Sequence, residues 1–369
     1  MKNACVILKN GKNISDGALC SLFGAFRTQG FVFDEVRTFL NIETEKFHTV
    51  LTELKREYEN VLLVADKTQL ISVKNIVCLS GAFKEDTFQG MLGGAGIFTE
   101  KKTSLFLVSA DGTETGSGYV NGVCLPYLQR KYGTKSGRTV VRTVGANETH
   151  VETLLAKAKT IDCGQMRYFH TRNNDEDIIE LLYDENIPKR LADDVLRLFA
   201  EGLDDSVYAL DDTPLAEQLV YLLKLRGRKI SVAESFTGGG VGRRIVSVSG
   251  ASEVYFEGLN TYNELSKMKR LGVTEYTLRS YGAVSDQTAY EMAAGLIATG
   301  NCDVSIATTG LAGPKTDRSM LPVGLCYIAI GTRERVFVYR YKFDGSREEI
   351  TEKAINYALF LAYKQLKNM

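Results

Sequence analysis

The sequence predicts an α/β protein built on mostly parallel sheets. Short apolar runs typical of buried strands, such as 61–65, 104–108, 230–233 and 304–307, alternate with helical patterns. This alternation implies βαβ units whose helices cover both faces of a sheet. The length of 369 residues suits two or three domains, and 44% hydrophobic residues suit packed cores.

We expect three domains, divided where the pattern changes. Residues 1–138 alternate strands and helices and should form a parallel-sheet domain. Residues 139–205 open with a strand at 139–144 and contain a polar, loop-like stretch at 172–177. They are otherwise mainly helical, which fits a small α+β linker domain, and the three acids of the stretch fit a solvated loop better than a metal site. Residues 206–369 form the last α/β domain.

The last domain shows its elements clearly. Its strands are expected at 230–233, 304–307, 323–330 and 336–343. A helix over 215–226 should end at Gly227, because glycine commonly terminates helices. Ser346 and Glu349 form an S-x-x-E capping box that predicts a final helix over 347–367.

Charge and composition exclude several classes of function. Forty-five basic residues balance 45 acidic ones, which argues against nucleic acid or a membrane surface as the main partner. No run approaches the ~20 apolar residues of a membrane span, and the short apolar start does not fit a signal peptide. A cytoplasmic protein is therefore expected. The seven cysteines form no C-x-x-C pair, so no metal is expected.

Histidine is nearly absent. The three histidines are His48, His150 and His170, and none follows in the last domain. A serine nucleophile there would have no local imidazole as its base. Lysine, aspartate, glutamate and tyrosine remain as proton carriers.

The most informative segment is AESFTGGGVG at 233–242. Ser235 and Thr237 bring hydroxyls to the carboxyl end of a strand, and the glycines at 238–240 allow close backbone approach. Free N–H groups at the following helix start attract phosphates and oxyanions. Taken alone, the segment also fits a tight strand-to-helix turn without a ligand. It is neither G-x-S-x-G nor a P-loop, since no lysine follows the glycines.

A second segment places Tyr262 and Lys267 five positions apart. If a strand ends near Tyr262 and a helix follows, both side chains can point into one crevice. A buried, neutral Lys267 can serve as base for Ser235, and Tyr262 can relay a proton. Alone, Lys267 fits a solvated surface lysine and Tyr262 a half-buried packing residue. The interpretation depends on their combination with Ser235.

Two further positions belong to the same predicted edge. The glycine-rich loop that contains Thr309 and Gly310 follows a buried strand, where open α/β sheets bind ligands. Arg347 opens the final helix, where an arginine can clamp a phosphate. The alternative for Arg347 is an ion pair on the helix surface.

Residues 206–369 resemble the C-terminal CinA domain, the nicotinamide-nucleotide amidase (NMN deamidase, PncC-like) family. The matching segments are AESFTGGGVGRRI at 233–245, SGASEVYFEGLNTYNELSKMKRLGV at 249–273, GAVSDQTAYEMAAG at 282–295, TTGLAGP at 308–314, PVG at 322–324 and GSR at 345–347. The resemblance implies a hydrolase of pyridine nucleotide salvage and NAD metabolism. It would convert nicotinamide mononucleotide to nicotinate mononucleotide and ammonia without a cofactor, as a homo-oligomer.

The same resemblance assigns roles residue by residue. It implies a catalytic Ser235 with Lys267 and Tyr262. The substrate-binding residues it implies are Thr237, Gly238, Gly239, Thr309, Gly310 and Arg347. Two departures are visible: Phe236 stands where the family often has cysteine, and residues 315–321 replace a glycine pair and a lysine.

The first ~205 residues resemble the N-terminal part of full-length CinA, a molybdopterin-binding-like domain with its linker. VRTVGANET at 141–149 and the junction at 207–235 carry this match. The phosphate-binding signatures are absent, because 65–70 and 108–115 replace the expected Gly-Gly-x-Gly-Pro-Thr and Pro-Gly-Pro-Pro loops. We therefore expect a degenerate N-terminal domain without ADP-ribose pyrophosphatase activity.

A function of another class stays open. The chain could be a non-catalytic nucleotide-binding scaffold or sensor, linked to competence or damage responses. The degenerate first domain and the altered loop at 315–321 favour it. Binding of nicotinamide mononucleotide without release of ammonia would distinguish this function from an amidase.

Overall fold

The computed structural model describes most of the chain in two compact units. The described residues are 2–9, 16–40, 43–79, 84–85, 96–109, 118–133, 137–183, 186–315 and 320–369. One unit comprises residues 1–138 and 182–188, and the other residues 139–181 and 189–369. Among the described helices, none has both the length and the apolar character that crossing a bilayer requires.

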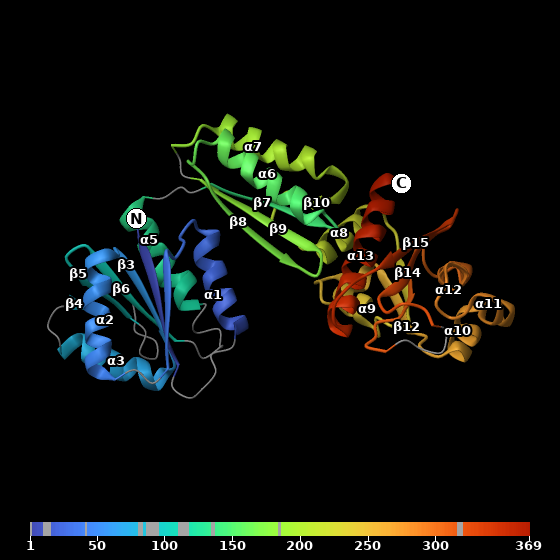
Figure 1. Cartoon of the computed structure of the whole chain (residues 1–369), viewed down its shortest axis with the longest axis horizontal. Helices are drawn as coiled ribbons and strands as arrows, with labels where there is room; N and C mark the ends of the chain where they lie inside the picture. The colour runs from blue at the N-terminus through green and yellow to red at the C-terminus, as the bar shows by residue number, and fades with distance from the viewer. Residues whose placement is uncertain are drawn as a thin grey trace. The chain divides into compact units, whose positions relative to one another are not determined.

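The first unit is built on a six-stranded sheet of order β2-β1-β3-β6-β5-β4 (Figure 1). Its strands are β1 (Asn3–Lys9), β2 (Glu35–Leu40), β3 (Asn60–Ala65), β4 (Lys84–Glu85), β5 (Gly96–Glu100) and β6 (Thr103–Ser109). Its helices are α1 (Asp16–Thr28), α2 (Thr44–Glu57), α3 (Lys67–Leu79), the π-helical turn η1 (Val120–Cys124) and α5 (Leu125–Tyr132). The first four strands of the order pair in parallel, and β5 and β4 add an antiparallel edge.

Buried cores on both faces of this sheet explain why β3 is apolar throughout. All six residues of β3 are buried, with Leu62 and Val64 in one core and Leu63 in the other. A strand covered on both faces reads as a continuous hydrophobic run rather than an alternating one. The predicted parallel-sheet α/β domain is confirmed, and its resemblance to molybdopterin-binding proteins stays a prediction.

The second unit begins with a four-stranded sheet of order β10-β7-β9-β8. Its strands are β7 (Gly137–Val144), β8 (Arg167–Asn173), β9 (Glu176–Tyr183) and β10 (Val207–Ala209). The helices α6 (Glu148–Ile161) and α7 (Lys189–Gly202) lie together along this sheet, and the 3₁₀ turn η2 (Asp204–Ser206) leads to β10 (Figure 1). The mixture of strands and helices fits the predicted α+β linker, whereas the predicted boundaries at 139 and 205 stay predictions.

The polar stretch at 172–177 was wrongly predicted to be a solvated loop. It forms the end of β8, a two-residue turn and the start of β9. Asp177 is fully buried and accepts hydrogen bonds from Arg172 (2.8 Å), His170 (2.8 Å) and Thr143 (3.1 Å). Buried charges must be paired and hydrogen-bonded, so this polar pattern encodes an internal network. Asp177 is buried because hydrogen-bond donors from other strands surround it, and the polarity of the local sequence does not reveal these donors.

The rest of the second unit is a five-stranded sheet of order β12-β11-β13-β14-β15. Its strands are β11 (Ile230–Glu234), β12 (Tyr255–Asn260), β13 (Val304–Gly310), β14 (Leu325–Thr332) and β15 (Val336–Lys342). Its helices are α8 (Leu215–Leu225), α9 (Gly240–Val246), α10 (Glu264–Leu271), α11 (Glu275–Tyr281), α12 (Asp286–Ala298) and α13 (Arg347–Asn368), with the 3₁₀ turn η3 (Ala251–Glu253). β12, β11 and β13 are parallel, and β14 and β15 are antiparallel to their neighbours.

Helices cover both faces of this sheet, as the apolar strand runs predict. Ile306 and Ile328 pack under α8, α9 and α13, whereas Ala307 and Ala329 face the core of α10, α11 and α12 (Figure 1). The predicted capping box is present: Ser346 accepts from the Glu349 N–H, and the Glu349 carboxylate accepts from the Ser346 N–H.

The buried network around Asp177 predicts an unequal effect of two aspartate substitutions. Asp177→Ala leaves the Arg172 guanidinium without its buried partner and should lower the free energy of unfolding by about 3–5 kcal/mol. Asp205→Ala removes an ion pair whose carboxylate is 98% exposed and should cost less than about 1 kcal/mol. Urea unfolding followed by circular dichroism measures both. Equal effects would contradict the buried network.

Candidate functional site

The carboxyl ends of three parallel strands bring the predicted site residues together. In the sheet register, Glu234 at the end of β11 lies opposite Asn260 of β12 and Thr308 of β13. The next residue, Ser235, donates its N–H to the Thr308 carbonyl at 3.0 Å. The N–H of Thr261 donates to the Glu234 carbonyl at 2.8 Å. The serine therefore leaves the sheet at the edge where open α/β sheets bind ligands.

Helix α10 presents Lys267 to this edge. Asn263 caps the helix by accepting the N–H of Leu265, which fixes its first turn directly after β12. The Lys267 side chain is only 1% exposed. Its Nζ lies 2.9 Å from Ser235 Oγ, 2.6 Å from the Thr261 carbonyl oxygen and 3.4 Å from the Tyr262 carbonyl oxygen. The solvated surface lysine is thereby excluded for Lys267.

The surroundings of Lys267 favour the neutral amine. Burial lowers its pKa to about 8, and the charge of Glu264 opposes this shift. A neutral amine carries two hydrogens and one lone pair. Two carbonyl oxygens and one hydroxyl surround it, so its two hydrogens can meet the carbonyls while its lone pair accepts the Ser235 proton. A neutral amine in this position can serve as a base for the serine hydroxyl.

Tyr262 contacts Lys267 through its backbone carbonyl and not through its side chain. Its carbonyl faces Lys267, but the residue is 67% exposed, so it is not the half-buried packing residue considered from the sequence. Within the described residues its hydroxyl has no hydrogen bond. Tyr262 therefore lies at the rim of the site.

The N–H groups of the glycine turn are already in use. Gly238 donates to the Ser235 carbonyl, Gly239 to the Glu234 carboxylate and Gly240 to the Thr237 carbonyl, at 3.0–3.1 Å. The sequence suggests free N–H groups at this helix start, but these three are bonded within the protein and are not free to hold an oxyanion or a phosphate. The glycines serve the turn itself, since Gly238 and Gly239 have φ of +59° and +96°.

Two other N–H groups beside Ser235 remain available. Those of Phe236 and Thr237 meet no acceptor among the described residues, and both follow Ser235 directly. The Thr237 hydroxyl is bonded to that of Thr308 at 2.7 Å. The Phe236 ring packs with Ala312 and Phe343 in a buried cluster. Phe236, which departs from the family pattern, thus fixes the turn by packing into this core.

The end of β13, the loop after it and the start of α13 approach the same edge. Thr309 and Gly310, which the sequence places in a loop, are the last two residues of β13. The Thr309 hydroxyl donates to the Ala283 carbonyl at 2.6 Å, and a side chain at Gly310 would collide with Cys326. Arg347 is exposed and donates to the Gly313 carbonyl at 2.7 Å. It forms no ion pair among the described residues. Its hydrogen bond to Gly313 instead joins the start of α13 to this loop. Residues 316–319 of the altered loop at 315–321, and residues 110–115, lie outside the described part of the chain.

Glu234 is the residue that sequence reasoning missed. The residue is 1% exposed, and its carboxylate accepts the N–H groups of Gly239 (3.0 Å), Val241 (3.1 Å) and Gly242 (2.8 Å). An acid directly before the serine, and shortly before the start of α9 at Gly240, is the available sequence signal. Across the described residues, no cluster of three or more potential metal ligands occurs.

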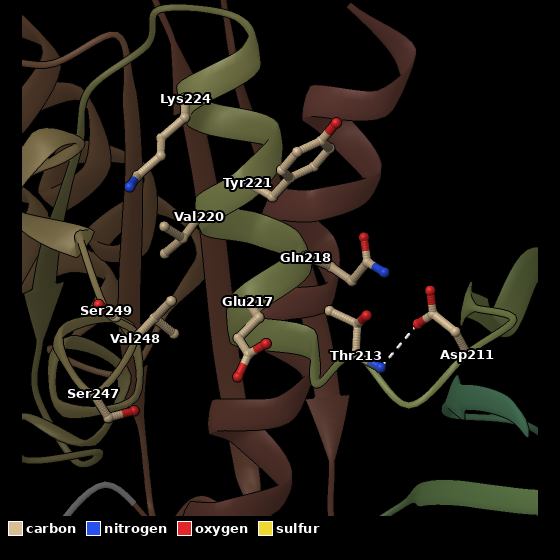
Figure 2. Close-up of a pocket in the computed structure, with 10 residues that line it drawn as sticks. All are labelled: Asp211, Thr213, Glu217, Gln218, Val220, Tyr221, Lys224, Ser247, Val248 and Ser249. Carbon is tan, nitrogen blue, oxygen red and sulfur yellow. Dashed lines mark hydrogen bonds between the residues drawn. The ribbon is translucent and has the colours of Figure 1, made fainter.

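A separate groove lies between α8 and the turn at 247–249. Figure 2 shows its lining, which includes Glu217, Tyr221 and Lys224 from α8. Its volume is about 800 Å³. None of the predicted site residues lines it, so it is distinct from the edge that carries Ser235 and Lys267.

Known proteins share this part of the chain. Residues 212–366 match the family model of the CinA C-terminal domain. A protein of Caldicellulosiruptor saccharolyticus described as competence-damage inducible is 35% identical over 66% of this chain and 60% of its own length. A CinA-like protein of Kosmotoga olearia is 40% identical over 43% of this chain and 39% of its own length. The crystal structure of a competence/damage inducible protein from Agrobacterium tumefaciens covers 42% of this chain and 93% of its own at 34% identity, with a TM-score of 0.40.

The fold of the five-stranded sheet and the family match describe the same α/β domain. Residues 212–366 belong to the CinA C-terminal domain family, as the sequence resemblance predicts. This chain spans about 60% of the length of the curated relatives that it matches first.

The buried amine makes stability depend on pH. Lys267 loses its proton near pH 8 in the folded protein and near its ordinary pKa of 10.5 in the unfolded chain. Between these values the unfolded state binds the extra proton, so this group makes the free energy of unfolding rise by about 1.4 kcal/mol per pH unit. Urea unfolding of wild type and Lys267→Met across this range measures both free energies of unfolding. The wild-type value minus the variant value should rise with pH. A difference independent of pH would contradict the lowered pKa.

Proposed function

We propose that this protein hydrolyses the carboxamide of nicotinamide mononucleotide, giving nicotinate mononucleotide and ammonia. The observation that carries the proposal is the 2.9 Å contact between Ser235 Oγ and the buried Lys267 Nζ. A serine with a neutral lysine as base supports acyl transfer without histidine. The family resemblance supplies the substrate, and membership of residues 212–366 in the CinA family supports it.

The first half-reaction forms an ester. Ser235 Oγ attacks the carboxamide carbon, and its proton passes to Lys267 Nζ. The carbonyl oxygen takes up negative charge in the tetrahedral intermediate. The C–N bond then breaks, and the departing nitrogen takes the proton from Lys267 and leaves as ammonia. The product is an ester between the nicotinoyl group and Ser235.

The second half-reaction releases the acid. Water attacks the ester carbon and gives a proton to Lys267, and the Ser235 oxygen takes that proton as the ester bond breaks. Lys267 returns to its neutral form after each half, so it serves as base and acid in turn.

Donors next to Ser235 suit the charge that develops. In this proposal the free N–H groups of Phe236 and Thr237 hold the oxyanion, because they follow the nucleophile directly and have no other acceptor among the described residues. Tyr262 meets the substrate at the rim and assists proton transfer to ammonia. Thr309, Gly310 and Arg347 border the same edge, where the mononucleotide would lie.

We propose no pyrophosphatase activity for the first unit. β3 ends at Ala65 and α3 begins at Lys67, so Asp66 alone joins them. This connection has no room for a glycine-rich phosphate loop, in agreement with the missing signature.

Removing the nucleophile should abolish turnover while binding persists. Ser235→Ala replaces only a hydroxyl at the strand end, so we expect ammonia release to fall by at least about 10³-fold with the fold intact. Ammonia from nicotinamide mononucleotide is measured by a coupled assay, and binding by calorimetry. Retained turnover would contradict the assignment. Binding by the wild type without any ammonia release would support the non-catalytic scaffold instead.

The rate should follow deprotonation of Lys267. Only the neutral amine accepts the serine proton, so kcat/KM should rise about tenfold per pH unit below the pKa and level off above about pH 8. Lys269→Met, which changes an exposed lysine on the same helix, is the matched control and should keep this profile. A profile that is flat between about pH 6 and 9 would contradict Lys267 as the base.

A further inference from the structure

A closed ring of contacts joins the nucleophile and its base through Glu234. The Glu234 carbonyl accepts the Thr261 N–H at 2.8 Å, and the Thr261 carbonyl accepts Lys267 Nζ at 2.6 Å. Lys267 in turn contacts Ser235, which is covalently joined to Glu234. The distance between Oγ and Nζ therefore depends on where the end of β11 lies.

The Glu234 side chain extends the ring to helix α9. Both carboxylate oxygens are used: Oε2 accepts from Gly239 and Val241, and Oε1 accepts from Gly242. Backbone N–H groups at a helix start have no partner within the helix, and a carboxylate satisfies them with charge-assisted bonds. Glu234 directly precedes the loop 235–239, and its carboxylate binds the N–H groups at the end of that loop and at the start of α9. The carboxylate thus ties the two ends of the loop together.

The helix start that this carboxylate binds lies close against β12. A side-chain carbon at Gly242 would lie 2.5 Å from the Tyr255 hydroxyl, and one at Gly239 would lie 3.2 Å from the Asn260 amide. Burial, with the charge of Glu234 adding to it, raises the pKa of Tyr255 to about 12. Glycine at both positions therefore lets the helix start approach β12 closely enough to reach the carboxylate.

We propose that Glu234 is a positioning residue: its buried carboxylate ties the first turn of α9 to the end of β11 and so holds Ser235 within reach of Lys267. The same bonds occupy the N–H groups that would otherwise attract the phosphate of a nucleotide. In the described part of this turn, the N–H groups of Phe236 and Thr237 then stay open beside the nucleophile. This inference rests on the proposed function of Ser235 as a nucleophile.

Glu234→Gln tests the proposal with little change of shape. The amide keeps one acceptor oxygen but turns an N–H toward backbone donors, so the loop loses at least one bond. Because small misplacements at a reacting centre are costly, kcat should fall about 10- to 100-fold, with KM within about twofold. The rate of Ser235 sulfonylation by phenylmethylsulfonyl fluoride, read by mass spectrometry, should fall likewise. In that reaction the Oγ–S bond forms, fluoride leaves and Lys267 takes the proton.

Asp162→Asn is the matched control. Asp162 is also fully buried and accepts two backbone N–H groups, from Gly164 at 2.8 Å and Met166 at 3.0 Å, but it belongs to the linker part of the unit. Both variants should unfold at lower temperature, and only Glu234→Gln should slow turnover and labelling. If Glu234→Gln does not fold, Glu234→Asp, which keeps the charge but is one methylene shorter, gives the same readouts.

The outcomes separate this inference from the function on which it rests. A folded Glu234 variant that reacts as fast as wild type overturns the positioning role and leaves the amidase intact. A wild-type protein that neither releases ammonia nor is labelled at Ser235 overturns the proposed function, and the positioning role falls with it.

Discussion

The buried contact between the Ser235 hydroxyl and the Lys267 amine is the interaction on which the site depends. An amine taken out of water favours its neutral form, because burial penalises the charged one. No carboxylate among the described residues pairs with Nζ and restores the charge; backbone carbonyls and the serine surround it instead. Burial thus lowers the pKa of this amine to about 8, and the proposed mechanism uses the neutral amine as its base in a domain without histidine.

The fold supplies this contact through strand ends rather than through loops alone. β11 delivers Ser235, and β12 leads directly into the helix that carries Lys267, so the parallel register of two neighbouring strands sets their spacing. Helix α13 supports the turn from the other side. Its Ile355 lies where a side chain at Gly240 would be, and Ala354 packs in the cluster that holds Phe236. Sites built on strands and packed helices hold their geometry better than sites on free loops.

Much of this arrangement can be predicted from the sequence, where local pattern and chemistry agree. The apolar runs predict the strands, Ser346 and Glu349 predict the start of α13, and the lack of histidine directs attention to Lys267. What escapes prediction depends on distant partners. Asp177 looks solvated until Arg172 and Thr143 are seen around it, and the glycine N–H groups look free until the Glu234 carboxylate is placed. Composition cannot show which donor meets which acceptor.

The most direct test of the central claim is to look for the ester on Ser235. Wild-type protein quenched in acid during turnover of nicotinamide mononucleotide should carry, on the peptide that contains Ser235, the mass of the substrate less ammonia. Lys267→Met should form no such adduct. Ammonia release by the wild type with no adduct on any peptide, under conditions that preserve esters, would contradict a covalent serine mechanism.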